Sequence, residues 1–120
     1  MKTLYTQKDG NTLASAATEL VSIVIPTHNA EKWIRDTLDS VIAQNYPHIE
    51  LIVVDDGSDD KTVAVVREKL TVDFPTKWQI IELPGNAGPS AARNVGLKEA
   101  SGSWVQFLDG DDFIAATKLE

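Results

Sequence analysis

Apolar positions along the chain alternate between short β-branched runs and stretches with a helical period. Residues 20–25 form the first β-branched run, and Pro26 closes it. Residues 30–44 follow with apolar side chains spaced i, i+4, i+7 and i+8, which is one face of a helix: Ile34, Leu38, Val41 and Ile42. The pattern therefore predicts a strand followed by a helix.

The same alternation continues toward the end of the chain. Further strands are predicted at residues 49–54, 78–83 and 104–108, and further helices at residues 61–70 and 89–100. Strands without regular polar alternation are typical of strands buried on both faces. Strands that alternate with helices form right-handed β-α-β crossovers, so we expect an α/β fold with a mainly parallel sheet.

Polar and special residues at the ends of these runs predict where the helices begin and end. Asn29 is a candidate N-cap of the first helix, and Ser58 or Asp59 can cap the second. Pro89 suits the first turn of the third helix. Gly102 can close that helix in a left-handed conformation.

The amino-terminal segment has a different character. Residues 1–19 are polar and lack the apolar stretch of a signal peptide, so we expect a disordered or loosely attached tail with some helical content. Residues 20–120 then form the folded domain. No apolar run approaches the roughly 20 residues that span a bilayer. A cytoplasmic location is expected, with peripheral attachment at the cytoplasmic face of a membrane left open.

Composition narrows the classes of partner and site. The 120 residues suffice for one small domain, and the formal net charge of −7 argues against a nucleic-acid partner. Absence of cysteine excludes disulfides and thiolate metal sites. The two histidines, His28 and His48, have no metal-ligand spacing, which argues against a histidine-based zinc site.

Three of the predicted strands end in polar groups. The first runs into residues 26–29, the second into Asp55 and Asp56, and the last into residues 109–112. Because ligands of parallel sheets bind beyond the carboxyl ends of the strands, these groups are expected at one edge of the sheet.

The Asp109-Gly110-Asp111-Asp112 group is the strongest candidate for metal chemistry. Adjacent carboxylates repel, and a divalent cation such as Mg²⁺ or Mn²⁺ removes that repulsion. A solvated acidic turn is the alternative, but the apolar strand before the group favours a site at the sheet edge. Asp55 and Asp56 can accept hydrogen bonds from a nucleobase or ribose, although helix capping competes as an explanation nearby. Arg93, near the start of the third helix, suits a diphosphate or a base.

Four segments together resemble the inverting family-two glycosyltransferases with the GT-A fold, a Rossmann-like three-layer α/β/α architecture. The resemblance rests on residues 21–29 (VSIVIPTHN), 50–58 (ELIVVDDGS), 86–94 (NAGPSAARN) and 107–112 (FLDGDD). They occur in the family's order and at about its spacing, and cover residues 20 to about 113. Gly110 stands where the family more usually has serine.

The resemblance implies a nucleotide-diphospho-sugar donor, with a UDP-sugar favoured, and a Mn²⁺ or Mg²⁺ cofactor. Pro26, Thr27 and His28 would line the base pocket, Asp56 would contact the base, and Arg93 would lie near the nucleotide. Asp111 would bind the metal directly, with Asp109 nearer the ribose. The full set of expected donor-binding residues is Pro26, Thr27, His28, Asn29, Asp55, Asp56, Arg93 and Asp109, and the expected metal ligands are Asp111 and Asp109.

In similar enzymes the catalytic base and the acceptor-binding region follow the acidic motif. We therefore expect the base beyond Glu120, the fold to be truncated after its fourth strand, and this chain to be a fragment that binds donor. The acceptor would be a saccharide or a lipid-linked molecule, as in polysaccharide and cell-wall synthesis. Alternatives are a non-catalytic nucleotide-binding module and a Mg²⁺-dependent phospho-receiver or phosphatase-like domain. A phospho-receiver and a phosphatase of this kind both place an acidic residue after the first strand. This chain has residues 26–29 there, which argues against both.

Overall fold

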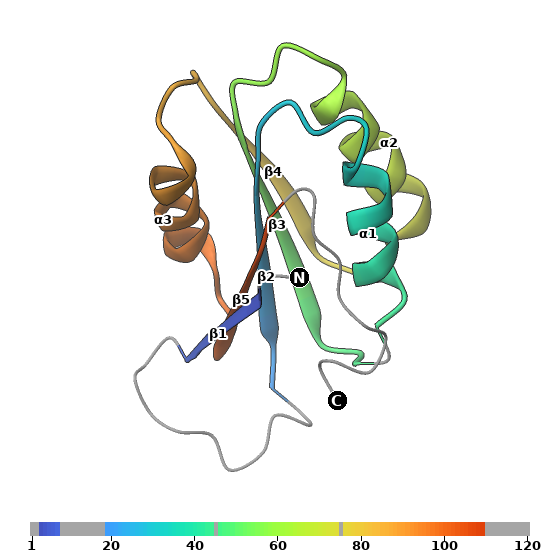
Figure 1. Cartoon of the computed structure of the whole chain (residues 1–120). Coiled ribbons are helices and arrows are strands. Elements are labelled where there is room, and N and C mark those ends of the chain that lie inside the picture. The colour runs from blue at the N-terminus through green and yellow to red at the C-terminus, as the bar shows by residue number, and fades with distance from the viewer. Residues whose placement is uncertain (1–2, 8–18, 45, 75, 110–120) are drawn as a thin grey trace.

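The computed structural model describes residues 3–7, 19–44, 46–74 and 76–109 (Figure 1). The elements that the apolar pattern predicts are present, with shifts of a few residues at some ends. In chain order they are β1 (Thr3–Gln7), β2 (Val21–Thr27), α1 (Ile34–Ile42), β3 (Ile49–Asp56), α2 (Thr62–Asp73), β4 (Trp78–Leu83), α3 (Pro89–Glu99) and β5 (Trp104–Leu108).

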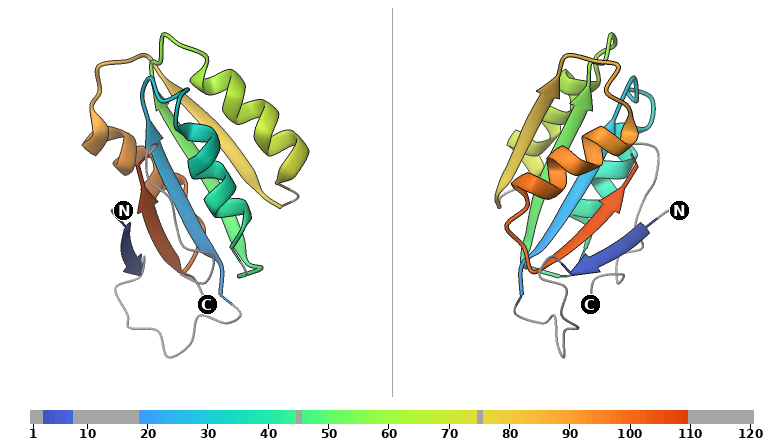
Figure 2. Two further views of the ribbon diagram at one scale, coloured as in Figure 1. Left: turned by 45° about the vertical axis from the view of Figure 1, so that its right-hand side comes forward. Right: turned by 90° about the vertical axis from the view of Figure 1, so that its left-hand side faces the viewer.

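These strands form one sheet in the order β1-β5-β2-β3-β4. Strands β5, β2, β3 and β4 run parallel to one another, which confirms the mainly parallel α/β fold. Helices α1 and α2 cover one face of the sheet and α3 covers the other, so the molecule has three layers (Figures 1 and 2).

The amino-terminal segment differs from the expected tail. Thr3–Gln7 forms β1, which pairs antiparallel with β5 at the edge of the sheet, with Tyr5 opposite Gln106. The pairing partner lies about a hundred positions away, so no local pattern in a short polar segment could predict it. The expectation of a disordered or partly helical tail was therefore wrong for these five residues.

Alternate residues of the central strands enter two separate apolar cores, as expected for strands buried on both faces. Ile23 and Val53 pack in the core beneath α1 and α2. Val24 and Val54 pack in the core beneath α3. Helix α3 lies very close to the sheet, because a Cβ added to Gly96 would stand 2.2 Å from Cγ1 of Val24.

Two predicted helix starts are formed differently. Asn29 has a φ of 49° and precedes a turn, and the residue before α1 is Trp33. The residue before α2 is Lys61, and the first amide of α2 is instead bound by Asp60, whose Oδ1 accepts the Thr62 N–H at 2.9 Å.

Gly102, after the end of α3, was predicted for the wrong reason. Gly102 is absent from the described residues with positive φ, so it does not close α3 in a left-handed conformation. A Cβ at Gly102 would lie 2.6 Å from Oγ of Ser22 and 2.7 Å from the carbonyl oxygen of Leu20. Close packing of the α3–β5 turn on β2 therefore explains this glycine. Pro89 does occupy the first turn of α3, as predicted.

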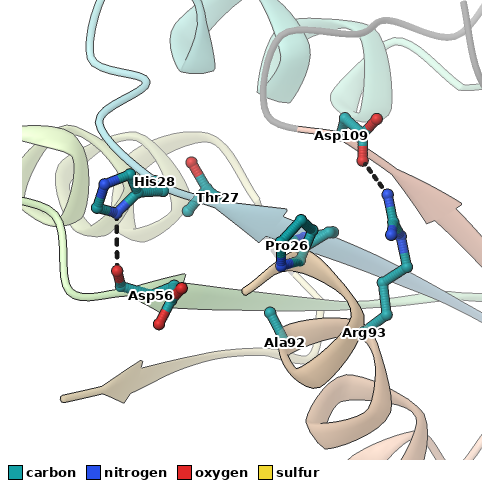
Figure 3. A pocket seen from close by; sticks show the side chains of 8 residues that line it. Pro26, Thr27, His28, Asp56, Ala92, Arg93 and Asp109 are labelled. Carbon is teal, nitrogen blue, oxygen red and sulfur yellow. Dashed lines mark hydrogen bonds and ion pairs between the residues drawn. The ribbon is translucent and has the colours of Figure 1, made fainter. Parts of the chain in front are cut away.

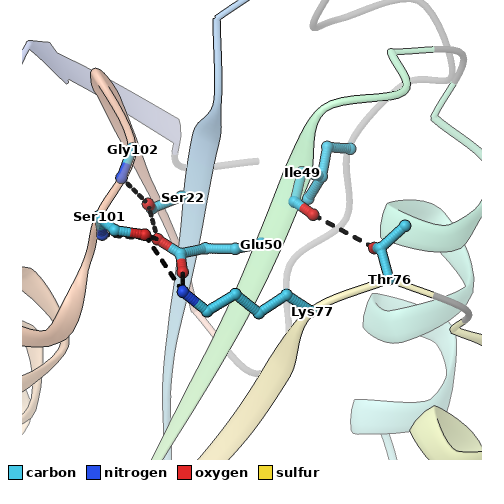
Figure 4. A network of polar contacts seen from close by, with 7 residues as sticks. All are labelled: Ser22, Ile49, Glu50, Thr76, Lys77, Ser101 and Gly102. Atoms are coloured by element: carbon cyan, nitrogen blue, oxygen red, sulfur yellow. Dashed lines mark hydrogen bonds and ion pairs between the residues drawn. The ribbon is translucent and has the colours of Figure 1, made fainter.

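The α3–β5 turn is held by the buried carboxylate of Glu50, at the amino ends of the strands (Figure 4). Glu50 of β3 is 1% exposed. Its Oε2 accepts hydrogen bonds from Ser22 Oγ at 2.5 Å and from the Ser101 N–H at 2.6 Å. Lys77 Nζ lies 3.3 Å from its Oε1. Burial acts to raise the pKa of Glu50, but these hydrogen bonds outweigh it and lower the pKa below its usual value.

Candidate functional site

A pocket of ≈ 530 Å³ lies at the carboxyl ends of the parallel strands. From β2 the chain adds β3 and β4 on one side, and α3 then carries it across the sheet to β5 on the other side. Ligands of open α/β sheets bind at such a change of direction. The pocket is lined by Pro26, Thr27, His28, Asp56, Pro89, Ala92, Arg93 and Asp109 (Figure 3). The structure thus brings together six of the predicted donor-binding residues.

The end of β2 supplies an apolar ring, a hydroxyl and an imidazole. Thr27 is 5% exposed, and its Oγ1 has no hydrogen-bond partner among the described residues. A buried hydroxyl that stays unpaired costs free energy, so Thr27 lowers the stability of the fold beside the pocket.

His28 is held in one orientation by its neighbours. Its Nδ1 lies 2.7 Å from the backbone oxygen of Asp56, which can only accept, so Nδ1 carries the proton (Figure 3). The side-chain amide of Asn29 lies 3.2 Å from Nε2 and can donate to it. One face of the ring therefore lies at the pocket while both nitrogens are engaged.

The two adjacent aspartates at the end of β3 have different tasks, because successive side chains of a strand point to opposite faces. Asp56 lies on the α3 side with Val54 and lines the pocket. Asp55 lies on the other side and is not among the lining residues. Its carboxylate accepts from the Ser58 N–H at 2.9 Å and from Ser58 Oγ at 2.5 Å. Asp55 thus closes a turn beside the pocket, and its predicted donor contact stays a prediction.

Asn29 likewise lies outside the lining. Its backbone N–H donates to Ser58 Oγ at 2.8 Å, and its Oδ1 accepts the Asp59 N–H at 2.8 Å. These bonds join the loop after β2 to the loop after β3. Asn29 and the turn closed by Asp55 thus support the pocket from the side of α1 and α2.

The far end of the pocket holds an ion pair. Arg93, on α3, donates from Nη2 to Oδ1 of Asp109 at 2.9 Å (Figure 3). Asp109 directly follows β5, so the pair joins α3 to the end of that strand. Both side chains are half-buried at the lining, where an anionic group would meet the guanidinium and a cation would meet the carboxylate.

The predicted metal ligand Asp111 lies outside the described residues. Within the described ranges, no group of three histidine, aspartate or glutamate side chains could hold a metal ion. Asp109 by itself offers a carboxylate of the type that Mg²⁺ and Mn²⁺ prefer. Both ions commonly bind through one or two carboxylates and substrate phosphates, so Asp109 fits as part of such a set.

Two lining residues were not predicted from the sequence. Pro89 and Ala92 form the α3 wall of the pocket. Their signal was present, because the small residues of the Gly-Pro-Ser-Ala-Ala run permit a helix to begin close to a sheet edge. The combined lining can pack against a ring at the β2 end and stabilise negative charge at the Arg93 end.

Comparisons with known proteins agree with this arrangement. Residues 22–120 match the model of glycosyl transferase family 2. An uncharacterised glycosyltransferase of Haemophilus influenzae is 44% identical over 101 residues, which are 84% of this chain and 40% of that protein. The poly(ribitol-phosphate) β-N-acetylglucosaminyltransferase TarS of Staphylococcus aureus is 40% identical over 82% of this chain and 17% of its own length.

Solved structures show the same fold. S. aureus TarS 1–349 in complex with UDP aligns with a TM-score of 0.77 and 37% identity, over 83% of this chain and 30% of that one. The mannosyltransferase PcManGT of Pyrobaculum calidifontis, in complex with GDP-Man and Mn²⁺, aligns with a TM-score of 0.76 and 30% identity, over 81% and 29%. The chain thus spans less than half the length of the relatives it matches. These likenesses favour the transferase hypothesis over a phospho-receiver or phosphatase.

The longest helix in the described part of the chain has 12 residues. None of the helices there combines the length and the apolar character that crossing a bilayer requires.

Proposed function

Because the chain belongs to glycosyl transferase family 2, we propose that its pocket holds the nucleotide diphosphate of a sugar donor, from which the sugar is transferred with inversion to an acceptor hydroxyl. The observation that carries this proposal is the pocket at the position where parallel sheets bind ligands, with the guanidinium of Arg93 on its lining. Relatives solved with UDP, UDP-GlcNAc or GDP-Man support the class of ligand.

In this proposal the two ends of the pocket bind different parts of the donor. Pro26, Thr27 and His28 face the nucleoside, whose ring can pack on the proline and imidazole. Arg93 faces the diphosphate, where its charge stabilises the leaving group as negative charge develops on it. A UDP-sugar is favoured, with UDP-bound TarS among the similar structures.

Asp109 fits the beginning of a metal site, and Asp111 is proposed to complete it. A Mn²⁺ or Mg²⁺ ion held there would neutralise charge on the diphosphate. The ion pair with Arg93 keeps Asp109 at the pocket. The relative solved with Mn²⁺ and GDP-Man supports a divalent ion in this class of protein.

Inverting transfer also needs a carboxylate base for the acceptor hydroxyl. Both pocket carboxylates among the described residues are engaged, Asp109 by Arg93 and Asp56 by backbone amides. Asp109 is in addition proposed to hold the metal, so neither carboxylate is assigned the role of base. This supports the expectation that the base is supplied from another part of the protein.

Calorimetric titration with UDP, with and without Mn²⁺, tests the proposal. We expect binding that requires the metal and that weakens at least about tenfold in Arg93→Ala, the loss typical of one charge-assisted contact. Arg67→Ala is the matched control, because Arg67 is 56% exposed on α2 and pairs only loosely with Glu82 at 3.6 Å. UDP binding that ignores both the metal and the Arg93 substitution would contradict the proposal.

A further inference from the structure

Both carboxylate oxygens of Asp56 are bound by one loop. The Ala87 N–H donates to Oδ1 at 3.1 Å, and the Gly88 N–H donates to Oδ2 at 2.9 Å. These amides come directly before Pro89, the first residue of α3. Hydrogen bonds to an ionised carboxylate are stronger than neutral ones, so Asp56 is a strong anchor for the start of this helix.

A separate backbone contact joins the same two loops. Gly57, next to Asp56, has a φ of +67°, and a Cβ there would lie 2.6 Å from Cα of Gly85. The loop after β3 and the loop after β4 therefore touch through their main chains. The Asp56 carboxylate extends from this contact to the last residues before α3, so the loop is held at two places.

The anchor determines the position of the pocket wall. Ala92 and Arg93 lie within the first two turns of α3, and Arg93 is about 6 Å along the helix axis from Pro89. The His28 imidazole donates to the backbone oxygen of Asp56, so the β2 end of the pocket is tied to the same residue (Figure 3). Movement at residues 87 and 88 would therefore shift Arg93 relative to His28.

We propose that Asp56 is a positioning residue of the donor pocket: its carboxylate holds the Ala87 and Gly88 amides and thereby fixes α3 and Arg93. This inference rests on the proposed function insofar as the pocket binds nucleotide. It adds a task to the base contact that the family resemblance implies for Asp56. The charge of Asp56 is used inside the protein, at the amino end of a helix where an anion is favoured.

Asp56→Asn tests the anchor directly, since asparagine keeps the shape but turns an NH₂ toward one of the two amides. Hydrogen exchange measured by NMR on the 120-residue chain should become at least about tenfold faster at Ala87 and Gly88, as expected for loss of one charge-assisted bond. Asp55→Asn is the matched control. It makes the same change at the neighbouring buried carboxylate, which accepts from Ser58. Its effect should appear at Ser58 and leave the amides of Ala87 and Gly88 protected.

Nucleotide affinity separates positioning from base contact. If Asp56 acts through the loop, Asp56→Asn weakens both UDP and GDP, because the displaced Arg93 serves any diphosphate. A changed preference between UDP and GDP, with unchanged exchange at Ala87 and Gly88, overturns the proposal.

Two further outcomes also test the proposal. If Asp56→Asn does not fold, the wild-type chain decides: protection of both amides supports the anchor, and exchange at the rate of an unstructured chain overturns it. If the wild-type chain binds neither nucleotide, the proposed function fails, while amide exchange in Asp56→Asn still tests the loop contact.

Discussion

Replacing Thr27 by valine should stabilise the fold and leave the affinity for UDP unchanged. Valine has nearly the shape of threonine, and the change removes only the hydroxyl. That hydroxyl is buried at the pocket wall and has no partner among the described residues. Folding therefore loses the water contacts of the hydroxyl without gaining a protein contact.

The size of both effects follows from that geometry. An unsatisfied buried polar group costs about 1–3 kcal/mol, so the free energy of unfolding of Thr27→Val should rise by about 1 kcal/mol. The hydroxyl has almost no accessible surface, so its removal takes no hydrogen bond from a bound ligand, and the affinity for UDP should not change.

Urea unfolding of the free protein and calorimetry with UDP measure the two quantities. Thr62→Val is the matched control, because the hydroxyl of Thr62 is equally buried but accepts from the Ala30 N–H at 2.8 Å and donates to Asp60. We expect this control to lose about 1–3 kcal/mol of stability. A Thr27→Val protein that is as destabilised as Thr62→Val would refute the reasoning, since its hydroxyl would then have a partner within the fold.

Two further substitutions test the packing beneath the site. Glu50→Gln should lower the free energy of unfolding by about 2 kcal/mol at pH 7, because a charged acceptor of several buried donors is lost. Because folding lowers the pKa of Glu50, its ionised carboxylate stabilises the fold above the usual glutamate pKa, and this stabilisation is lost as the pH falls below it. The free energies of unfolding of the two proteins in urea should therefore converge in acid. Gly96→Ala should cost about 1–2 kcal/mol, the overpacking against buried Val24 outweighing the better helix propensity of alanine; unchanged urea stability would show that α3 can move away.

The sequence predicted most of the fold because its signals are local. Apolar runs and helical spacing gave the elements from β2 to β5, and connectivity alone brought the polar strand ends to one edge. What it missed depends on residues distant in the chain. The pairing of β1 with β5 is one example, and the bonds of Asn29 with Ser58 and Asp59 are another, since those residues are about thirty positions apart.

The candidate site was predicted as a set, but its division of roles was not. Asp55 and Asp56 looked equivalent in the sequence, although strand alternation sends them to opposite faces of the sheet. Only the position of α3 shows which face holds the pocket, and that position depends on packing at Gly96 and on the amides of residues 87 and 88. The pairing of Arg93 with Asp109 also requires the crossover of α3 to be known.

The central claim is that a nucleotide diphosphate binds at the carboxyl ends of β2, β3 and β5, and amide mapping by NMR tests it most directly. On titration with UDP and Mg²⁺, the account predicts the largest shifts at Thr27, His28, Arg93 and Asp109. The shifts should shrink when Mg²⁺ is omitted. Saturable shifts confined to other parts of the chain, or no shifts at millimolar UDP with Mg²⁺, would contradict it.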